Sequence, residues 1–328
     1  MKLTDPFGRH ITYLRLSVTD RCNYRCVYCM SEDMTFLPRA QLLSLEECAQ
    51  ISAAFVDMGV KKIRITGGEP LIRRDIASLF QQLGRLPSLD ELTLTTNGTH
   101  LPYHASDLAA AGVRRINISL DTLCANQFHE ITRTGSLDDV FCGIDAARQA
   151  GIETIKLNAV ILRHRNLNQV IPLLQFALRE SLDISFIEEM PLGAVVDHQR
   201  ETEFCSSAEL RALMAEHYEL QPTTINTGGP SRYWRVDGSL SRVGFISPHS
   251  DNFCGDCNRV RVTAEGKLLL CLGNEDAVDL KALIRRYPGD RERLKQTIVD
   301  ALALKPEKHH FYENDQPQII RFMNATGG

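Results

Sequence analysis

The sequence lacks several features that mark secreted, membrane-spanning or nucleic-acid-binding proteins. Its 328 residues carry a formal net charge of only −4, so no overall basic field favours nucleic acid or an acidic membrane. The first eight residues contain no apolar run typical of a signal peptide, and no later stretch approaches the roughly 18 apolar residues of a membrane helix. We therefore expect a folded, cytoplasmic protein that binds neither membranes nor nucleic acid.

Cysteine, in contrast, is plentiful. The cytosol keeps thiols reduced, so ten cysteines point to metal binding more than to a disulfide framework. Six of them form two groups of three: Cys22, Cys26 and Cys29 near the start, and Cys254, Cys257 and Cys271 near the end. The remaining four have no second thiol at ligand spacing, and we assign them to packing or surface positions. They are Cys48, Cys124, Cys142 and Cys205.

The first two thirds of the chain alternate β-branched runs with helical patterns, which is typical of βα units around a parallel sheet. We count six units, with strands expected at residues 13–19, 61–66, 91–95, 115–120, 154–161 and 182–188. Helices are expected to begin near Ser44, Asp75, Tyr103, Ser136, Leu167 and Ser206. Three of these starts have an acidic residue three positions after a serine, the pattern of a capping box. They are Ser44, Ser136 and Ser206.

The pattern changes after the sixth unit. Residues 223–230 are rich in Thr, Gly and Pro, so we place a boundary between a barrel region, residues 1–222, and a smaller α+β region, residues 223–328. Hairpins are expected from residues 231–236 with 242–247, and from residues 259–264 with 267–272. Helical patterns at residues 278–287 and 290–304 follow.

The first cysteine group directly follows the first expected strand, at the end that is catalytic in βα barrels. Three thiolates can each bind one iron of a [4Fe–4S] cluster and leave the fourth iron open to a small molecule. Zinc is the alternative, but a tetrahedral site needs a fourth ligand and this loop contains no histidine. The C-x3-C-x2-C spacing in this context resembles the radical S-adenosylmethionine superfamily. Residues 67–70 match its GGEP motif, although a glycine pair alone would indicate only a tight turn.

The second cysteine group is C-x2-C followed by Cys271, which the expected hairpin returns to the same place. It too can hold a cluster with an open iron; a zinc ribbon is the alternative, but its second half would supply only Cys271. Arg259 and Arg261 alternate on the strand between, so both guanidinium groups point to one side, where they suit phosphate oxygens. An exposed strand with alternating charge is the other interpretation. Arg15 and Arg64 lie on expected barrel strands, where burial is costly without an anionic partner.

Taken together, these features resemble the GTP 3′,8-cyclase family of molybdenum cofactor biosynthesis, from Tyr13 to the final Gly327-Gly328. The resemblance implies an incomplete (β/α)6 TIM-like barrel, closed by the C-terminal region with a second [4Fe–4S] cluster, in a homodimer. It implies that reductive cleavage of S-adenosylmethionine gives a 5′-deoxyadenosyl radical, which removes hydrogen from C3′ of GTP and leads to 3′,8-cyclo-7,8-dihydro-GTP. The implied partners are an electron donor of the flavodoxin or ferredoxin type and, downstream, cyclic pyranopterin monophosphate synthase.

The same resemblance assigns roles to individual residues. The contacts to S-adenosylmethionine fall on Tyr28, Gly68, Ser119 and Met190. The contacts to GTP fall on Arg15, Arg64, Thr95, Lys156, Arg259 and Arg261. A catalytic role in the active site falls on Gly327 and Gly328, whereas residues 191–204 receive no assignment. Apart from the resemblance, His309 and His310 are expected to face solvent. Three competing interpretations remain: another radical enzyme with auxiliary clusters, a structural zinc protein, and a ferredoxin-like carrier, which would normally use four cysteines per cluster.

Overall fold

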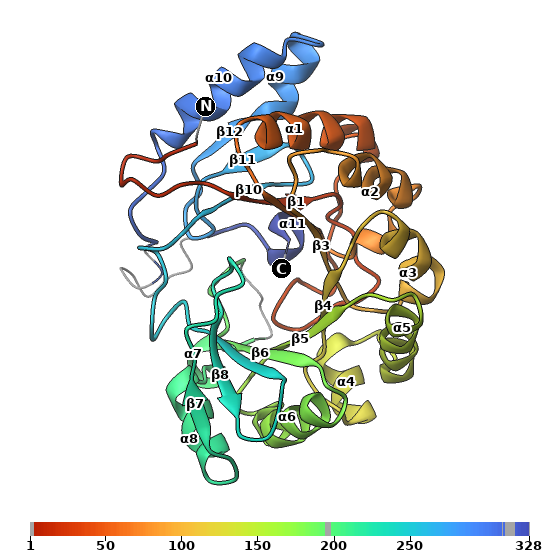
Figure 1. The fold of residues 1–328 in the computed structure, drawn as a ribbon, viewed down its shortest axis with the longest axis vertical. Coiled ribbons are helices and arrows are strands. Elements are labelled where there is room, and N and C mark those ends of the chain that lie inside the picture. Colours follow the sequence, from red (N-terminus) through yellow and green to blue (C-terminus); the bar gives the residue numbers. More distant parts are fainter. Residues whose placement is uncertain (1–2, 194–197, 310, 312–318, 328) are drawn as a thin grey trace.

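Six parallel strands in chain order form the centre of the molecule, as the alternating pattern predicts (Figure 1). The computed structural model describes residues 3–193, 198–309, 311 and 319–327. The strands are β1 (Tyr13–Ser17), β2 (Lys62–Thr66), β3 (Glu91–Thr96), β4 (Arg115–Ser119), β5 (Thr154–Val160) and β6 (Asp183–Ile187). They curve around the C-terminal segment in Figure 1, with helices on the outside. The expected incomplete barrel is thereby confirmed.

The expected helices are all present on the outer side of this sheet. They are α1 (Leu45–Asp57), α2 (Ile76–Gly84), α3 (Leu101–Ala110), α5 (Leu137–Gln149), α6 (Val170–Arg179) and α8 (Ser207–Ala215). The capping boxes at Ser44 and Ser206 are confirmed. The one expected at Ser136 is wrong, because that side chain makes no capping hydrogen bond; two aspartates in the first turn supply favourable charge there instead. Three α-helices of the described residues were not predicted: α4 (Ala125–Thr132), α7 (Arg200–Glu203) and α11 (Met323–Thr326).

The C-terminal strands extend both edges of the same sheet. β10 (Arg259–Val262) pairs in parallel with β1, and β9 (Arg242–Ile246) pairs in parallel with β6. Antiparallel strands continue outward on each side: β11 (Lys267–Leu269), β12 (Ala277–Asp279), β8 (Arg232–Val236) and β7 (Leu220–Pro222). Both expected hairpins are confirmed, as are the last two long helices, α9 (Leu280–Arg286) and α10 (Arg291–Leu302).

The register between β1 and β10 determines where the two cysteine groups lie. Tyr13 pairs with Arg259, so Cys257 precedes β10 at the amino end of β1. Cys22 comes after the carboxyl end of β1. At about 3.3 Å per residue, the five residues of β1 separate these ends by roughly 13 Å. The two groups therefore lie at opposite ends of one strand.

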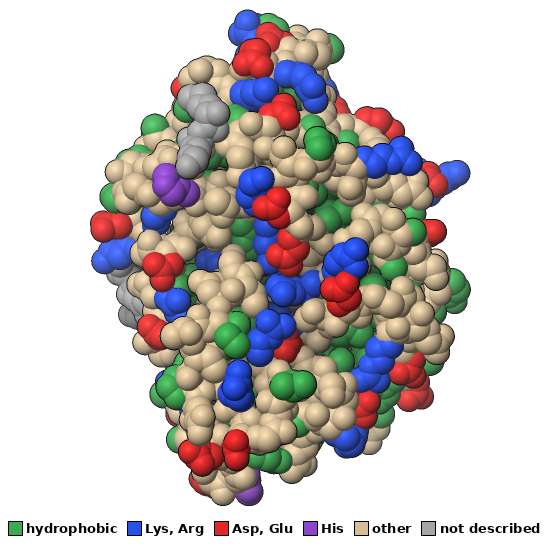
Figure 2. Space-filling model, in the orientation of Figure 1, with side chains coloured by type: hydrophobic (Ala, Val, Ile, Leu, Met, Phe, Trp, Pro, Cys, Tyr) green, Lys and Arg blue, Asp and Glu red, His purple; other side chains and the backbone are tan. Residues whose placement is uncertain are grey.

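A large apolar core fills the space between the sheet and the outer helices, and Cys48 lies in it as expected. Cys205 is also buried, whereas Cys124 and Cys142 are exposed. On the face drawn in Figure 2, basic and acidic side chains are interleaved, with several Lys and Arg side chains near the middle of the view. No helix in the described part of the chain is long and apolar enough to cross a membrane.

Candidate active site

The first cysteine group occupies the loop after β1, and its thiols lie close enough to affect one another's pKa. Burial, followed by the nearby Glu69 carboxylate, raises the pKa of Cys22 to about 12. Burial and the Cys22 thiol raise that of Cys29 to about 12, and burial raises that of Cys26 well above its ordinary value. Such thiols become thiolates only beside strong positive charge, which iron ions supply. The donor set therefore fits an iron–sulfur cluster.

No group of three or more His, Cys, Asp or Glu side chains in the described ranges is placed to hold one metal ion. A cubane cluster distributes its thiolates over separate irons.

The glycine pair of the GGEP motif positions the cysteine loop. The Gly68 amide donates to the Thr19 carbonyl at 2.8 Å, and the Glu69 amide donates to the Arg21 carbonyl at 2.8 Å. A Cβ on Gly68 would lie 2.2 Å from the Arg21 carbonyl oxygen, so only glycine allows this approach. The sequence predicted close approach to a ligand, and the structure shows close approach to the segment that leads into Cys22.

Glu69 of the same motif ties the end of β2 to the end of β3. Its buried carboxylate accepts hydrogen bonds from the Leu71 amide at 2.9 Å, the Thr96 hydroxyl at 2.8 Å and the Asn97 amide at 2.6 Å. Burial nevertheless raises its pKa to about 7. The carboxylate thus has a structural role, and it adds negative potential beside the first cysteine group.

The residues expected to contact S-adenosylmethionine lie at the carboxyl ends of four strands. Tyr28 donates its hydroxyl to Asp121 at 2.7 Å, and Asp121 also accepts from the Val160 amide at 2.8 Å. Burial raises the pKa of Asp121 to about 6. Ser119 ends β4 beside Asn158, while Gly68 follows β2 and Met190 follows β6. Met190 also borders the cavity described next.

A cavity connects the barrel interior to the second cysteine group. Its lining includes six Lys and Arg residues from β1, β2, β5 and β10: Arg15, Lys62, Arg64, Lys156, Arg259 and Arg261. Five of the six residues expected to contact GTP are among them. The sixth, Thr95, lies behind the lining and accepts a hydrogen bond from Arg64 at 3.1 Å. The alternative of a solvent-exposed strand for Arg259 and Arg261 is wrong, because both side chains line this cavity.

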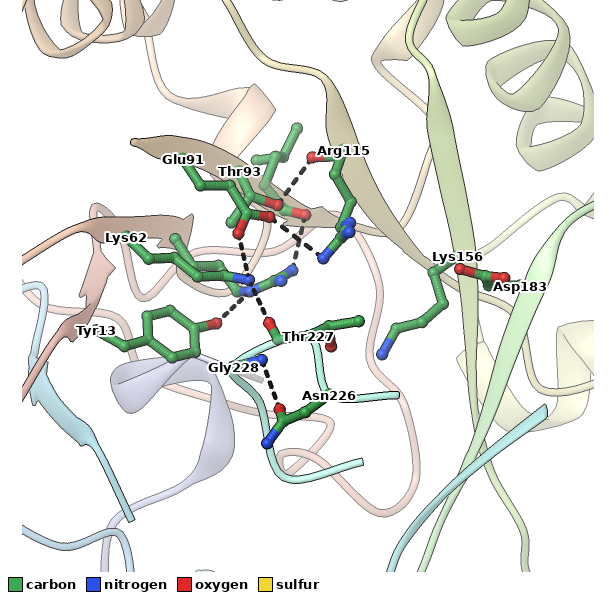
Figure 3. A network of polar contacts seen from close by, with 12 residues as sticks. Tyr13, Lys62, Glu91, Thr93, Arg115, Lys156, Asp183, Asn226, Thr227 and Gly228 are labelled. Carbon is green, nitrogen blue, oxygen red and sulfur yellow. Dashed lines mark hydrogen bonds and ion pairs between the residues drawn. The ribbon is translucent and has the colours of Figure 1, made fainter. Parts of the chain in front are cut away.

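Three of the cavity cations are buried and three are half-buried, and few carboxylates compensate them. Burial, opposed in part by the Tyr13 hydroxyl, lowers the pKa of Arg15 to about 10, and burial lowers that of Arg261 well below its usual value. Lys62 contacts the Glu91 carboxylate at 2.7 Å and the Thr227 carbonyl at 3.0 Å (Figure 3). This concentration of positive charge is suited to a polyanion.

Several cavity residues were not predicted, although the strand period offered a signal for two of them. Lys62 and Tyr13 each lie two positions from a predicted arginine, and therefore on the same face of the strand. The Tyr13 hydroxyl accepts from Arg64 Nε at 2.5 Å. Asn117 and Asn158 also line the cavity, and their Oδ1 atoms are buried with no hydrogen-bond partner among the described residues. Such oxygens would accept hydrogen bonds from a ligand.

The second cysteine group borders the same cavity, so the hairpin does bring Cys271 back to Cys254 and Cys257. Burial would raise the pKa of Cys257, but Arg259, Lys305 and Arg9 outweigh it and lower the pKa. Burial raises that of Cys271. His309, which we expected in solvent, lines the cavity and packs against Phe311 with ring centroids 4.3 Å apart and an interplanar angle of 36°. His310 lies outside the described residues.

The C-terminal tail links the two ends of the site. α11 (Met323–Thr326) lies inside the barrel, where the Asn324 amide hydrogen-bonds the Cys29 thiol and its side chain donates to the Asp20 carbonyl at 2.8 Å. The Gly327 carbonyl accepts from Arg261 at 2.8 Å. A Cβ on Gly327 would lie 2.1 Å from the Thr66 methyl carbon, so the close fit requires glycine. Gly328 lies outside the described residues.

Comparisons with known proteins agree with this geometry. Residues 16–177 match the Radical SAM superfamily, and residues 182–311 match Molybdenum Cofactor Synthesis C. GTP 3′,8-cyclase of Ectopseudomonas mendocina is 60% identical over 327 residues, covering 100% of this chain and 99% of the relative. GTP 3′,8-cyclase 2 of Pseudomonas aeruginosa is 57% identical over the same shares. Streptococcus suis SuiB bound to S-adenosylmethionine has a similar fold, with TM-score 0.64 and 17% identity, over 97% of this chain and 78% of that protein.

Proposed function

This chain belongs to the GTP 3′,8-cyclases of the radical S-adenosylmethionine superfamily, and on that premise we propose which of its residues bind the clusters, S-adenosylmethionine and GTP. The reaction removes the hydrogen on C3′ of the GTP ribose and joins C3′ to C8 of guanine. The product is 3′,8-cyclo-7,8-dihydro-GTP, used in molybdenum cofactor synthesis. The [4Fe–4S] cluster and S-adenosylmethionine supply the 5′-deoxyadenosyl radical that takes this hydrogen.

We propose that Cys22, Cys26 and Cys29 hold the first cluster and that S-adenosylmethionine binds beside them. Tyr28, Gly68, Ser119 and Met190 would contact it. The support is positional: all four lie near the carboxyl ends of strands, and the first cysteine group follows the carboxyl end of β1. Two carboxylates whose pKa values burial raises, Glu69 and Asp121, lie at this end and favour a cationic ligand. The ammonium and sulfonium groups of S-adenosylmethionine are cations.

We propose that GTP occupies the cavity between this end and the second cysteine group. Arg15, Arg64, Lys156, Arg259 and Arg261 would hold its phosphates and ribose, with Thr95 acting through Arg64. The observation that carries the proposal is the convergence of six cations and three thiols on one cavity. Fixing the ribose beside the adenosyl group makes hydrogen removal effectively intramolecular, worth up to roughly 7–11 kcal/mol.

We propose that Cys254, Cys257 and Cys271 hold a second [4Fe–4S] cluster whose open iron binds the guanine base. Its donor set of three soft thiols fits such a cluster, and its position in the cavity lining suits contact with a substrate. Iron analysis after anaerobic purification tests this assignment. About eight irons per chain are expected, whereas about four would leave only the first cluster, and zinc in this group would contradict the assignment.

We propose that the Gly327-Gly328 tail has a catalytic role by shaping this cavity. The Gly327 carbonyl accepts a hydrogen bond from one donor of Arg261, so the tail fixes the orientation of this guanidinium group. The remaining donors would bind the phosphates. Deleting both glycines should impair turnover and leave iron content unchanged. A fully active truncated enzyme would contradict this role.

We propose that a flavodoxin- or ferredoxin-type protein delivers electrons to the first cluster. The charged residues that line a hollow beside Arg21, the residue before Cys22, are five arginines and one aspartate: Arg21, Arg39, Arg73, Arg74, Arg285 and Asp75. This excess of positive charge suits an acidic carrier.

Cyclic pyranopterin monophosphate synthase would use the product, and the enzyme would work as a homodimer in the cytoplasm. All ten cysteines are free, which fits a reducing compartment. The boundary between residues 222 and 223 stays a proposal from the sequence, and the antiparallel pair of β7 and β8 crosses it.

Isotope transfer tests the function as a whole. The enzyme is incubated anaerobically with S-adenosylmethionine, a reductant and GTP deuterated at C3′. Deuterium should appear in 5′-deoxyadenosine, which mass spectrometry detects. Its absence, with 5′-deoxyadenosine still formed, would show that GTP is not the hydrogen donor.

A further inference from the structure

Lys305, three residues after α10, is a buried cation in unusual surroundings. Its side chain is almost completely enclosed, with 3% of the residue exposed. It forms no ion pair with a carboxylate anywhere in the described ranges of the chain. A buried ammonium without an opposite charge is costly, so its position requires an explanation.

The ammonium of Lys305 points at the second cysteine group. It donates to the Arg259 carbonyl at 3.1 Å, to the Leu270 carbonyl, and to the Cys257 sulfur at 3.7 Å. Leu270 directly precedes Cys271, and Arg259 follows Cys257 by two residues. One ammonium therefore joins the two segments that carry the ligands.

A second buried cation holds the same region from the other end of the chain. Arg9, paired with Asp5 at 2.6 Å, donates to the Cys254 carbonyl at 2.7 Å. It also donates to the carbonyls of Pro306 at 2.7 Å and Glu307 at 2.6 Å. The segment from Lys305 to Glu307 is thus fixed to all three parts of the cysteine group.

We infer that Lys305 is a positioning residue of the second cluster: it holds the Cys257 and Cys271 segments together and places a fixed positive charge beside a ligating sulfur. This inference rests on the proposal that the second group binds a [4Fe–4S] cluster. A cation and an N–H donor at a cluster sulfur stabilise the reduced, more negative state, so they raise the reduction potential. The missing counter-charge of Lys305 is then the cluster with its thiolates.

The test uses the full chain with Cys22, Cys26 and Cys29 changed to Ala, so that only the second group loads. Lys305→Met removes the charge at similar length, and Lys308→Met removes an exposed charge three residues away. After anaerobic reconstitution, the readouts are iron per chain, iron loss to a chelator, and midpoint potential from a titration followed by electron paramagnetic resonance. We expect Lys305→Met to lower the potential and speed iron loss, and Lys308→Met to match the parent.

Two further variants separate charge from folding. Lys305→Arg keeps the charge and should hold the potential closer to the parent than Lys305→Met does. Lys305→Gln keeps N–H donors for the two carbonyls without the charge and should lower the potential in a chain that folds normally by circular dichroism. A Gln variant with the parent's potential and iron retention would overturn the inference. A parent chain without iron would instead overturn the second cluster itself, which distinguishes the two failures.

Discussion

The two ends of β1 carry equivalent sets of three cysteines in opposite electrostatic surroundings. At the carboxyl end, burial and the carboxylates of Glu69 and Asp121 raise thiol pKa values. At the amino end, Arg259 and Lys305 lower the pKa of Cys257 despite its burial. The difference matches the two ligands of a GTP 3′,8-cyclase, because S-adenosylmethionine carries cationic groups whereas GTP carries a triphosphate. In the proposed arrangement, a strand of five residues separates two ligands of opposite charge.

Repulsion between the clustered cations at the amino end of β1 destabilises the folded chain as long as no anionic ligand is bound. Arg15 lies near Arg64 and Arg259, and these like charges lower its pKa, after the larger effect of burial and against the effect of Tyr13. Arg261 experiences the same effect from Arg15 and Arg259. Binding of a triphosphate would relieve this repulsion. The clustered cations therefore lower the stability of the empty chain, and they suit the cavity to an anionic substrate.

The largest effect should come from removing one cysteine at each end. Cys22→Ala should abolish cleavage of S-adenosylmethionine, because it removes a ligand of the first cluster. Cys257→Ala should leave that cleavage measurable and abolish cyclisation of GTP, because the two ends have separate tasks. Chromatography of 5′-deoxyadenosine and of the GTP product measures both. If the two variants lose both products to the same extent, the proposed division is wrong.

The next largest effect should come from Arg261, which binds the tail and lines the cavity. Arg261→Met removes charge-assisted hydrogen bonds worth about 1.5–3 kcal/mol, so KM for GTP should rise about ten- to a hundredfold. KM for S-adenosylmethionine should change little, because we propose that this ligand binds at the other end. The control is Arg114→Ala, which removes an exposed ion pair with Glu153. A comparable rise in both KM values would contradict the charge division.

A smaller effect on the same end is expected from Tyr13→Phe. The hydroxyl accepts a 2.5 Å hydrogen bond from Arg64 and lies near Arg15 and Lys62, which together lower its pKa to about 7 although burial opposes this. Losing it should misplace Arg64 and raise KM for GTP by roughly five- to tenfold, equivalent to about 1 kcal/mol. Tyr103→Phe, at a 77% exposed position, is the matched control. Equal kinetics in the two variants would remove Tyr13 from the phosphate site.

The order of the barrel strands was predictable from sequence, whereas the meeting of distant segments was not. The alternation of β-branched runs with helical patterns located β1 to β6. The period of two along a strand correctly placed Arg259 and Arg261 on one face. Nothing in the local pattern indicates that β10 pairs with β1, or that Lys305 and Arg9 reach the second cysteine group, because these contacts join residues far apart in the chain. β7 and β12 are only three residues long, too short for a period to appear. The expectation that His309 faces solvent was wrong because it rested on polarity alone, whereas the contact with the Phe311 ring depends on tertiary packing.

The smallest expected effect is a pH dependence of stability, caused by Asp121 at the carboxyl end of the strands. The folded-state pKa of Asp121, about 6, exceeds its ordinary value of 3.8, so between these values the folded chain binds more protons than the unfolded chain. Stability should therefore fall as pH rises through this window and level off above about 6. In Asp121→Asn the amide oxygen can accept from the Val160 amide while the NH2 group donates to the Tyr28 oxygen, with the donor and acceptor of that contact exchanged. The variant cannot ionise, so its stability should fall less than that of the parent, by about 1 kcal/mol between pH 5 and 7.5. Urea unfolding of the iron-free chains measures this difference, and parallel pH curves would show that Asp121 ionises as freely in the folded chain as in the unfolded one.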